Sequence, residues 1–97
     1  MQSKIFNEVL SLVSAESDIP TYIITSKCRL AEVVDARQLV VWFCSTSGLY
    51  PRAIAELLGI SRQAVQQKLQ TVESRRKQHP FKYLFERIER KLQERRK

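Results

Sequence analysis

Apolar residues recur along this chain at spacings of three and four positions, which is the period of an α-helix. Sustained alternation of apolar and polar residues, the pattern of a half-buried strand, does not occur in the sequence. The pattern therefore predicts an all-α fold of about five helices in a compact, orthogonal bundle. The expected helices cover residues 4–14, 30–45, 51–58, 62–77 and 81–95.

The expected core centres on the second of these helices. Residues 30–45 are apolar on most sides, a distribution typical of a helix at the centre of a bundle. Gly48 is expected to end this helix, because many helices close on a left-handed residue. Ser3 is the expected N-cap of the first helix. We expect residues 16–29 to form an irregular connector, because Pro20 disfavours helical geometry in the residue before it.

Residues 51–74 have the spacing of a helix-turn-helix. Ala55 is small where the second helix would cross the first, Gly59 suits a tight turn, and Val65 is an inward anchor. Ser61 can cap the second helix. In this motif the second helix lies in the major groove of DNA. Similar spacings also occur by chance in helical hairpins, so the spacing needs support from other residues.

The second helix of this motif has a polar outer face. Counting roughly 100° per residue from Val65 places Leu69 and Val72 toward the core. Arginine pairs with guanine, and glutamine with adenine, at the major-groove edge of DNA. The alternative is a solvated helix face, which arginine and glutamine suit equally well. We expect base reading, and the candidate residues are Arg62, Gln63, Gln66 and Gln67.

The composition adds an asymmetry of charge. Residues 1–50 carry a net charge of −1 and residues 51–97 a net charge of +8. Such an asymmetry is typical of a protein with a polyanionic partner, most commonly nucleic acid. The simpler alternative is a solvated basic surface that only aids solubility.

Several basic residues extend the expected interface. Lys27 and Arg29 form a small patch in the connector, and a loop arginine of this kind can enter a minor groove. Lys68 lies on the second helix of the motif and is a candidate contact to the DNA backbone. Arg75 and Arg76 end the 62–77 helix, where they either contact phosphates or complement the helix dipole.

The sequence offers little for catalysis, metal binding or membrane insertion. Cys28, Cys44 and His79 are too few for a zinc site or a disulfide framework. Glu32 and Asp35 share a helix without a nearby nucleophile, so no enzyme activity is expected. No apolar run reaches the about 20 residues of a membrane span, and the start lacks the layout of a signal peptide. We expect one cytoplasmic domain, residues 1–97, that needs no cofactor and no metal.

Two segments of the chain resemble the C-terminal, box-recognition domain of the bacterial replication initiator DnaA. They are "SKCRLAEVVDARQLVVWF" (26–43) and "YPRAIAELLGISRQAVQQKLQTVES" (50–74). The most specific part is the Ala-Arg-Gln motif at its distance from the helix-turn-helix. The residues that carry the resemblance are Ser26, Lys27, Arg29, Ala36, Arg37, Gln38 and the stretch 54–65.

The resemblance implies an all-helical domain of the Trp-repressor-like helix-turn-helix group that reads a short box in double-stranded DNA. Arg29 matches the loop arginine that enters the minor groove, and Arg37 and Gln38 match positions near the DNA backbone. Ser61, Arg62 and Gln63 stand where the family has Asp-His-Thr as base readers, because "GISRQAV" (59–65), which is one residue shorter, replaces the family's "GGRDHTTV". We expect Ser61 to lie beside the DNA backbone. Because the reading side chains differ, we expect a target other than the initiator's box. The initiator's ATPase motif is missing from the sequence.

The expected function is therefore sequence-specific binding of double-stranded DNA, in replication initiation or transcription regulation, in a bacterial, nucleoid-associated protein. The alternative is a helical adaptor that docks a protein partner, or forms a homodimer, through the last helix. That helix carries an apolar stripe between residues 81 and 92, which would otherwise close the domain's own core.

Overall fold

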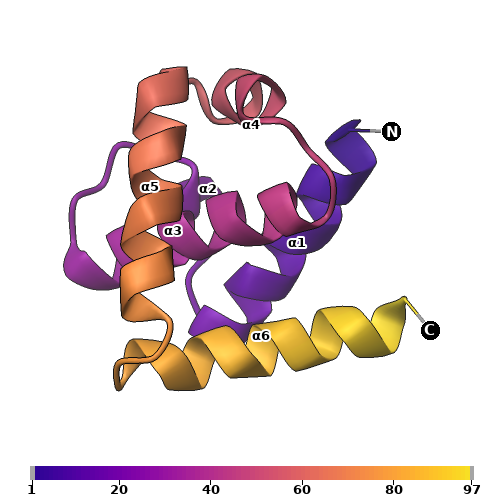
Figure 1. Ribbon diagram of the computed structural model, residues 1–97, viewed down its shortest axis with the longest axis vertical. Helices are drawn as coiled ribbons and strands as arrows, with labels where there is room; N and C mark the ends of the chain where they lie inside the picture. Colours follow the sequence, from indigo (N-terminus) through magenta and orange to yellow (C-terminus); the bar gives the residue numbers. More distant parts are fainter. Residues whose placement is uncertain (1, 97) are drawn as a thin grey trace.

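The protein, described here by a computed structural model for residues 2–96, is built from helices that are labelled in Figure 1. They are α1 (Gln2–Ser17), α2 (Thr21–Ile24), α3 (Ala31–Thr46), α4 (Pro51–Leu58), α5 (Arg62–Arg75) and α6 (Phe81–Arg95). No strand occurs within those residues. The all-α prediction is confirmed, and the last four helices end within two residues of the expected bounds.

The N-terminal third differs from the prediction in two ways. Ser3 lies inside α1, so the predicted N-cap is wrong, and α1 continues to a left-handed residue, Asp18, with φ 60°. The expected irregular connector contains α2, which makes six helices where about five were expected. Helix α2 follows directly on Pro20, and Ile24 at its end is completely buried. A turn of helix this short is held by its anchor in the core rather than by its own periodicity.

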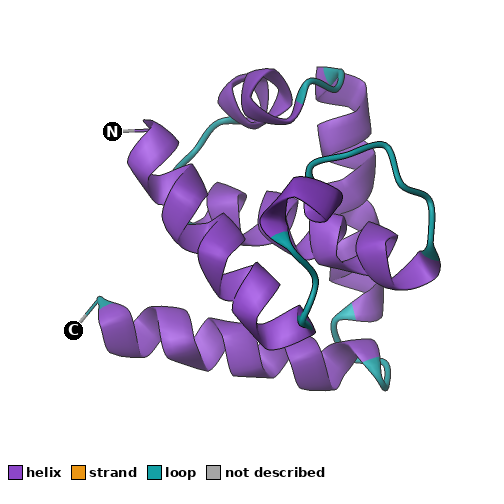
Figure 2. Cartoon of the chain, turned by 180° about the vertical axis from the view of Figure 1, so that it is seen from behind, coloured by secondary structure: helices purple, strands orange, loops and turns teal. Residues whose placement is uncertain are grey.

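Helix α3 lies at the centre of the molecule, as its apolar sequence predicts. It packs against every other helix, and Figure 2 shows the bundle from behind. Gly48 follows α3 with φ 105°, and the N–H of Leu49 donates to the carbonyl of Cys44 at 3.1 Å. These contacts turn the chain at the end of α3 as expected. Cys44 itself is buried in this core, and Cys28 is half-buried in a loop.

The apolar stripe of α6 belongs to this same core. Phe85 is 1% exposed and stacks against Phe43 with ring centroids 5.0 Å apart. Three other members of the stripe, Phe81, Ile88 and Leu92, are also buried, and Leu84 is half-buried against the same core. The stripe therefore closes the domain's own core, which is the alternative that the sequence left open for it.

Ion pairs fasten α6 to α1 and remove part of the positive charge of the C-terminal half. Glu16 accepts a hydrogen bond from Lys91 Nζ at 2.7 Å and forms an ion pair with Arg87, whose Nη2 lies 2.9 Å away, while Arg96 Nη2 lies 2.6 Å from Glu8. The hydrogen bond from Lys91 and the charges of Lys91 and Arg87 lower the pKa of Glu16. The asymmetry of charge along the sequence is therefore smaller on the surface of the folded protein.

Two further properties of the described chain bear on function. Among residues 2–96, no helix is both long enough and apolar enough to cross a membrane. The same residues contain no group of three or more histidine, cysteine, aspartate or glutamate side chains that could hold a metal ion.

Candidate nucleic-acid interface

Helices α4 and α5 are joined by a tight turn whose geometry follows from three residues of the sequence. Gly59 adopts φ 68° and ψ 36°, a left-handed conformation that glycine reaches without strain. The N–H of Ile60 then donates to the carbonyl of Ala55 at 3.0 Å, which closes α4. Ser61 Oγ accepts from the N–H of Ala64 at 3.0 Å and caps α5. The predicted turn and cap are confirmed.

Helix α5 is anchored on one side and open on the other. Val65 and Val72 are completely buried, and Leu69 is half-buried against the core. In Figure 1, α5 runs along one side of the molecule, with α4 beside its N-terminal end and α6 beside its C-terminal end. The side chains between the anchors are therefore free to meet a ligand over the N-terminal half of the helix.

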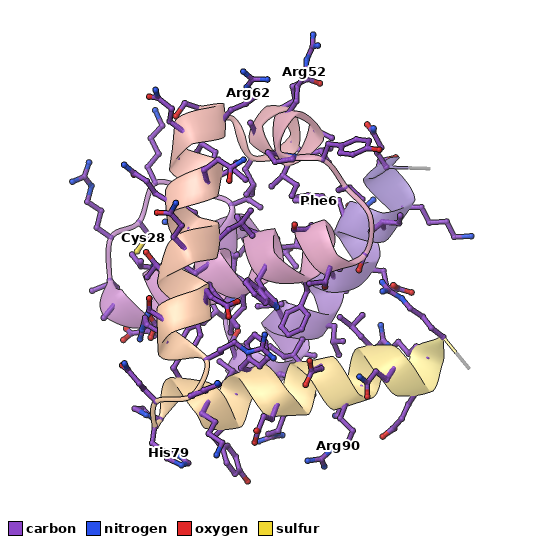
Figure 3. The ribbon with its side chains drawn as sticks, viewed as in Figure 1. Phe6, Cys28, Arg52, Arg62, His79 and Arg90 are labelled. Carbon is purple, nitrogen blue, oxygen red and sulfur yellow. The ribbon has the colours of Figure 1, made fainter. Side chains whose placement is uncertain are left out.

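The four candidate base-reading residues lie together in one open groove, which we call the reading groove. Its volume is about 720 Å³, and no acidic residue lines it. In Figure 3, Arg62 and Arg52 project from the same edge of the molecule. The lining residues are Tyr50, Pro51, Arg52, Arg62, Gln63, Gln66 and Gln67.

A second concavity, which we call the basic cleft, lies between the connector and the α4–α5 turn. It has a volume of about 300 Å³ and its wall includes Gly59 and Ile60. Its four charged side chains are all basic, and they are Lys27, Arg29, Arg37 and Lys68. Three of these residues come from the half of the sequence with a net negative charge. The fold thus gathers positive charge that the sequence keeps apart.

Arg37 faces the connector rather than open solvent. Its Nε donates to the carbonyl of Ile24 at 2.9 Å, and its Nη2 donates to the carbonyls of Ser26 at 2.6 Å and Cys28 at 3.1 Å. The guanidinium group thereby fixes the path of the loop that carries Lys27. Arg37 was predicted as a contact to the DNA backbone, and its observed contacts make it a residue that positions the loop.

The pKa of Lys68 is affected by its position in the basic cleft. Burial, together with the positive charge of Arg37, lowers the pKa of Lys68. Within residues 2–96, neither Lys27, Arg29 nor Lys68 forms an ion pair. A cluster of like charges without a carboxylate is unfavourable by itself, and an anion in the cleft would relieve it.

Three residues that were predicted to contact the DNA backbone lie outside both concavities and bind other parts of the protein. They are Gln38, Arg75 and Arg76. Arg75 Nη1 donates to Asp35 Oδ1 at 2.6 Å and to Gln38 Oε1 at 3.0 Å. The guanidinium group of Arg75 also lies 4.2 Å from the ring centroid of Phe81. Gln38 is nearly buried, with 9% of its surface exposed. These contacts hold the C-terminal end of α5 against α3 and α6.

Arg76 has a similar structural environment. Its guanidinium carbon lies 4.7 Å from the ring centroid of Phe85 and 5.3 Å from that of Trp42. Glu73 and Glu89 lie at 3.9 and 4.0 Å from its terminal nitrogens. The sequence suggested phosphate contact or dipole complementation for Arg75 and Arg76. The structure adds a third role for both, since they join helices.

Three residues of the reading groove, Tyr50, Pro51 and Arg52, were not among the sequence candidates. Tyr50 is 76% exposed and precedes α4, and Arg52 is paired only with Glu56, at 3.6 Å, within the described chain. The available signal was an aromatic and a basic residue on either side of Pro51, at the start of the first helix of the motif.

Comparisons of the chain with models of protein families, with curated proteins and with solved structures gave no match. The resemblance to the initiator's domain therefore depends on the motifs quoted above.

Proposed function

We propose that this chain is a sequence-specific, double-stranded DNA-binding domain in which α4 and α5 act as a helix-turn-helix. One observation carries the proposal. The exposed half of α5 lies between a groove lined by amide and guanidinium side chains and a cleft lined by four basic residues, and no acidic residue lines either one. Bases are recognised by hydrogen-bonding groups and phosphates by positive charge, so the two concavities match the two parts of a duplex.

The roles follow from where each side chain lies. Arg62 is exposed at the first position of α5, where helix-turn-helix proteins contact base edges, and it suits guanine O6 and N7. Gln63, Gln66 and Gln67 are exposed in the same groove and suit adenine N6 and N7. Ser61 lies beside Arg62, and its hydroxyl proton can be donated to a phosphate while its oxygen caps α5.

The basic cleft supplies the contacts that bind any duplex. Lys27 and Lys68 are the proposed phosphate contacts, and Arg29 is the proposed minor-groove side chain. Arg37 supports them by holding the loop, and Gln38, Arg75 and Arg76 support them by holding α3 and α5 together. The proposed interface is therefore smaller than the set of residues that the sequence suggested.

The biological setting is proposed from the resemblance to the initiator's box-recognition domain. It favours a bacterial protein of the cytoplasm, associated with the nucleoid, that acts in replication initiation or transcription regulation. The different residues at positions 61–63 favour a target other than the initiator's own box. The adaptor alternative has less support, because the apolar stripe of α6 on which it depended is buried.

Selection of bound duplexes from a random pool tests the proposal. We expect an enriched motif that binds about a thousandfold more tightly than random duplex at the same salt concentration. The affinity for random duplex should fall steeply with added salt, by about one unit of log–log slope for each phosphate contacted. An Arg90→Ala variant is the matched control, because Arg90 is an exposed arginine at the opposite end of the molecule from Arg62 (Figure 3). The proposal would be contradicted if no motif were enriched and the affinity for random duplex did not depend on salt.

A further inference from the structure

The reading groove contains an apolar surface that the hydrogen-bonding side chains do not account for. Tyr50 and Pro51 line it beside the arginine and glutamine side chains. Tyr50 is 76% exposed, and it is the one large exposed apolar side chain of the described residues that lines this groove. A single exposed aromatic residue is common on protein surfaces, so its meaning depends on its surroundings.

The side chain of Tyr50 has no structural task that would explain its position. It precedes α4 as the N-cap residue, but it makes no side-chain hydrogen bond to the helix. The start of α4 is stabilised by the backbone of Tyr50, because its carbonyl accepts a hydrogen bond from the N–H of Ile54 at 3.1 Å. Replacing the ring should therefore leave the start of α4 intact.

The chemistry of the groove fits the major-groove edge of A·T pairs. Three of its polar side chains are glutamines, which pair with adenine N6 and N7. At the same edge, the thymine of an A·T pair presents a C5-methyl group, which no other standard base of DNA carries. A groove that joins glutamine amides to a tyrosine ring and a proline ring therefore offers a partner for both members of the pair.

We propose that Tyr50 is a specificity-determining residue whose ring packs against the C5-methyl group of a thymine in the target site. The inference rests on the proposed function, and it names part of what the groove reads. The adenines should pair with Gln63, Gln66 or Gln67, and the thymine that meets Tyr50 should lie at or next to one of those pairs. Arg52, which is exposed beside Tyr50, would then approach the adjoining phosphate.

The test replaces thymine by deoxyuridine, which removes only the methyl group. Starting from the selected duplex, each thymine is replaced in turn and the affinity is measured by fluorescence anisotropy. At one position, the parent protein should bind about fourfold more weakly, the equivalent of about 0.8 kcal/mol for one buried methyl group. In Tyr50→Ala that same replacement should have no effect, because the ring is gone. Tyr50→Phe should retain the parent's fourfold loss.

The matched control is Tyr83→Ala, which removes another exposed tyrosine, from α6 and outside the groove. It should show the parent's response to deoxyuridine. Equal responses of the parent and Tyr50→Ala at every thymine would overturn the inference. So would a Tyr50→Phe variant that binds the selected duplex as weakly as Tyr50→Ala does and shows no response to deoxyuridine, since it would assign the hydroxyl group, bound to phosphate, as the contact. In both cases an enriched motif would still stand, whereas failure of the proposed function would leave no motif to test.

Discussion

Replacing Arg37 should change both the stability of the protein and its affinity for DNA. Its guanidinium group donates three hydrogen bonds to backbone carbonyls of the connector, from Nε to Ile24 and from Nη2 to Ser26 and Cys28. A hydrogen bond from a charged donor contributes about 1.5–3 kcal/mol when its partner is buried. Two of these bonds share one nitrogen and one is exposed to solvent, so we expect less than their sum.

We therefore expect Arg37→Ala to lower the free energy of unfolding by about 2 kcal/mol. For a domain of this size that corresponds to a fall in Tm of about 8–16 °C. The assays are thermal unfolding followed by circular dichroism and amide exchange of residues 25–30, which should become faster in the variant. Because Lys27 and Arg29 lie on this loop, affinity for selected and random duplexes should fall together, at a temperature where the variant is folded.

The Arg37→Lys variant distinguishes the hydrogen bonds that position the loop from the positive charge of the side chain. Lysine keeps the positive charge, but its single ammonium group cannot reach the three carbonyls as the planar guanidinium does. We expect the lysine variant to be nearly as unstable as the alanine variant, with equally fast exchange in the loop. A lysine variant with the parent's Tm, exchange and DNA affinity would refute the reasoning, because it would show that Arg37 acts only by its charge.

Three other substitutions or treatments test separate parts of the structure. Lys68→Met should weaken DNA binding and reduce the salt slope of the affinity by about one. The same variant should raise or preserve Tm in thermal unfolding, because it removes a half-buried charge from beside Arg37. A lower Tm with unchanged DNA binding would contradict this. Because the pKa of Glu16 is lower in the folded than in the unfolded chain, its stabilisation is present above about pH 4.5 and is lost as pH falls through the folded pKa. Glu16→Gln should lower Tm at pH 7 and flatten the acid limb of a plot of Tm against pH, and an unchanged limb would count against the pairing. Burial raises the pKa of the Cys44 thiol to about 12, so a thiol reagent at pH 8 should label Cys28 alone until the protein is unfolded, and rapid labelling of both thiols would disprove a buried Cys44.

The local features of the fold could be predicted because single residues determine them. Gly59 ends α4, Ser61 caps α5 and Pro51 begins α4, and each acts through its own backbone or a neighbour within a few positions. Helix α2 was missed because its four residues are too few to show a period. Ser3 was misplaced because a helix can begin before a good capping residue when its first turn is exposed.

The roles of the basic residues could not be predicted in the same way, because their partners lie far away in the sequence. Arg75 is 40 residues from Asp35 and 37 residues from Gln38, and no local pattern links them. The basic cleft likewise combines the connector with α5. Positive charge in the C-terminal half also suggested more interface than the fold leaves free, since Glu16 and Glu8 pair with residues of the C-terminal segment.

The most direct test of the central claim compares Arg62→Ala with Lys27→Ala on the selected duplex and on random duplex. If α5 reads bases and the basic cleft binds phosphates, Arg62→Ala should cost about 1–3 kcal/mol on the selected duplex and little on random duplex. Lys27→Ala should weaken binding to both duplexes by the same factor and reduce the salt slope by about one. Equal effects of the two variants on both duplexes would contradict the assignment of α5 as the reading helix.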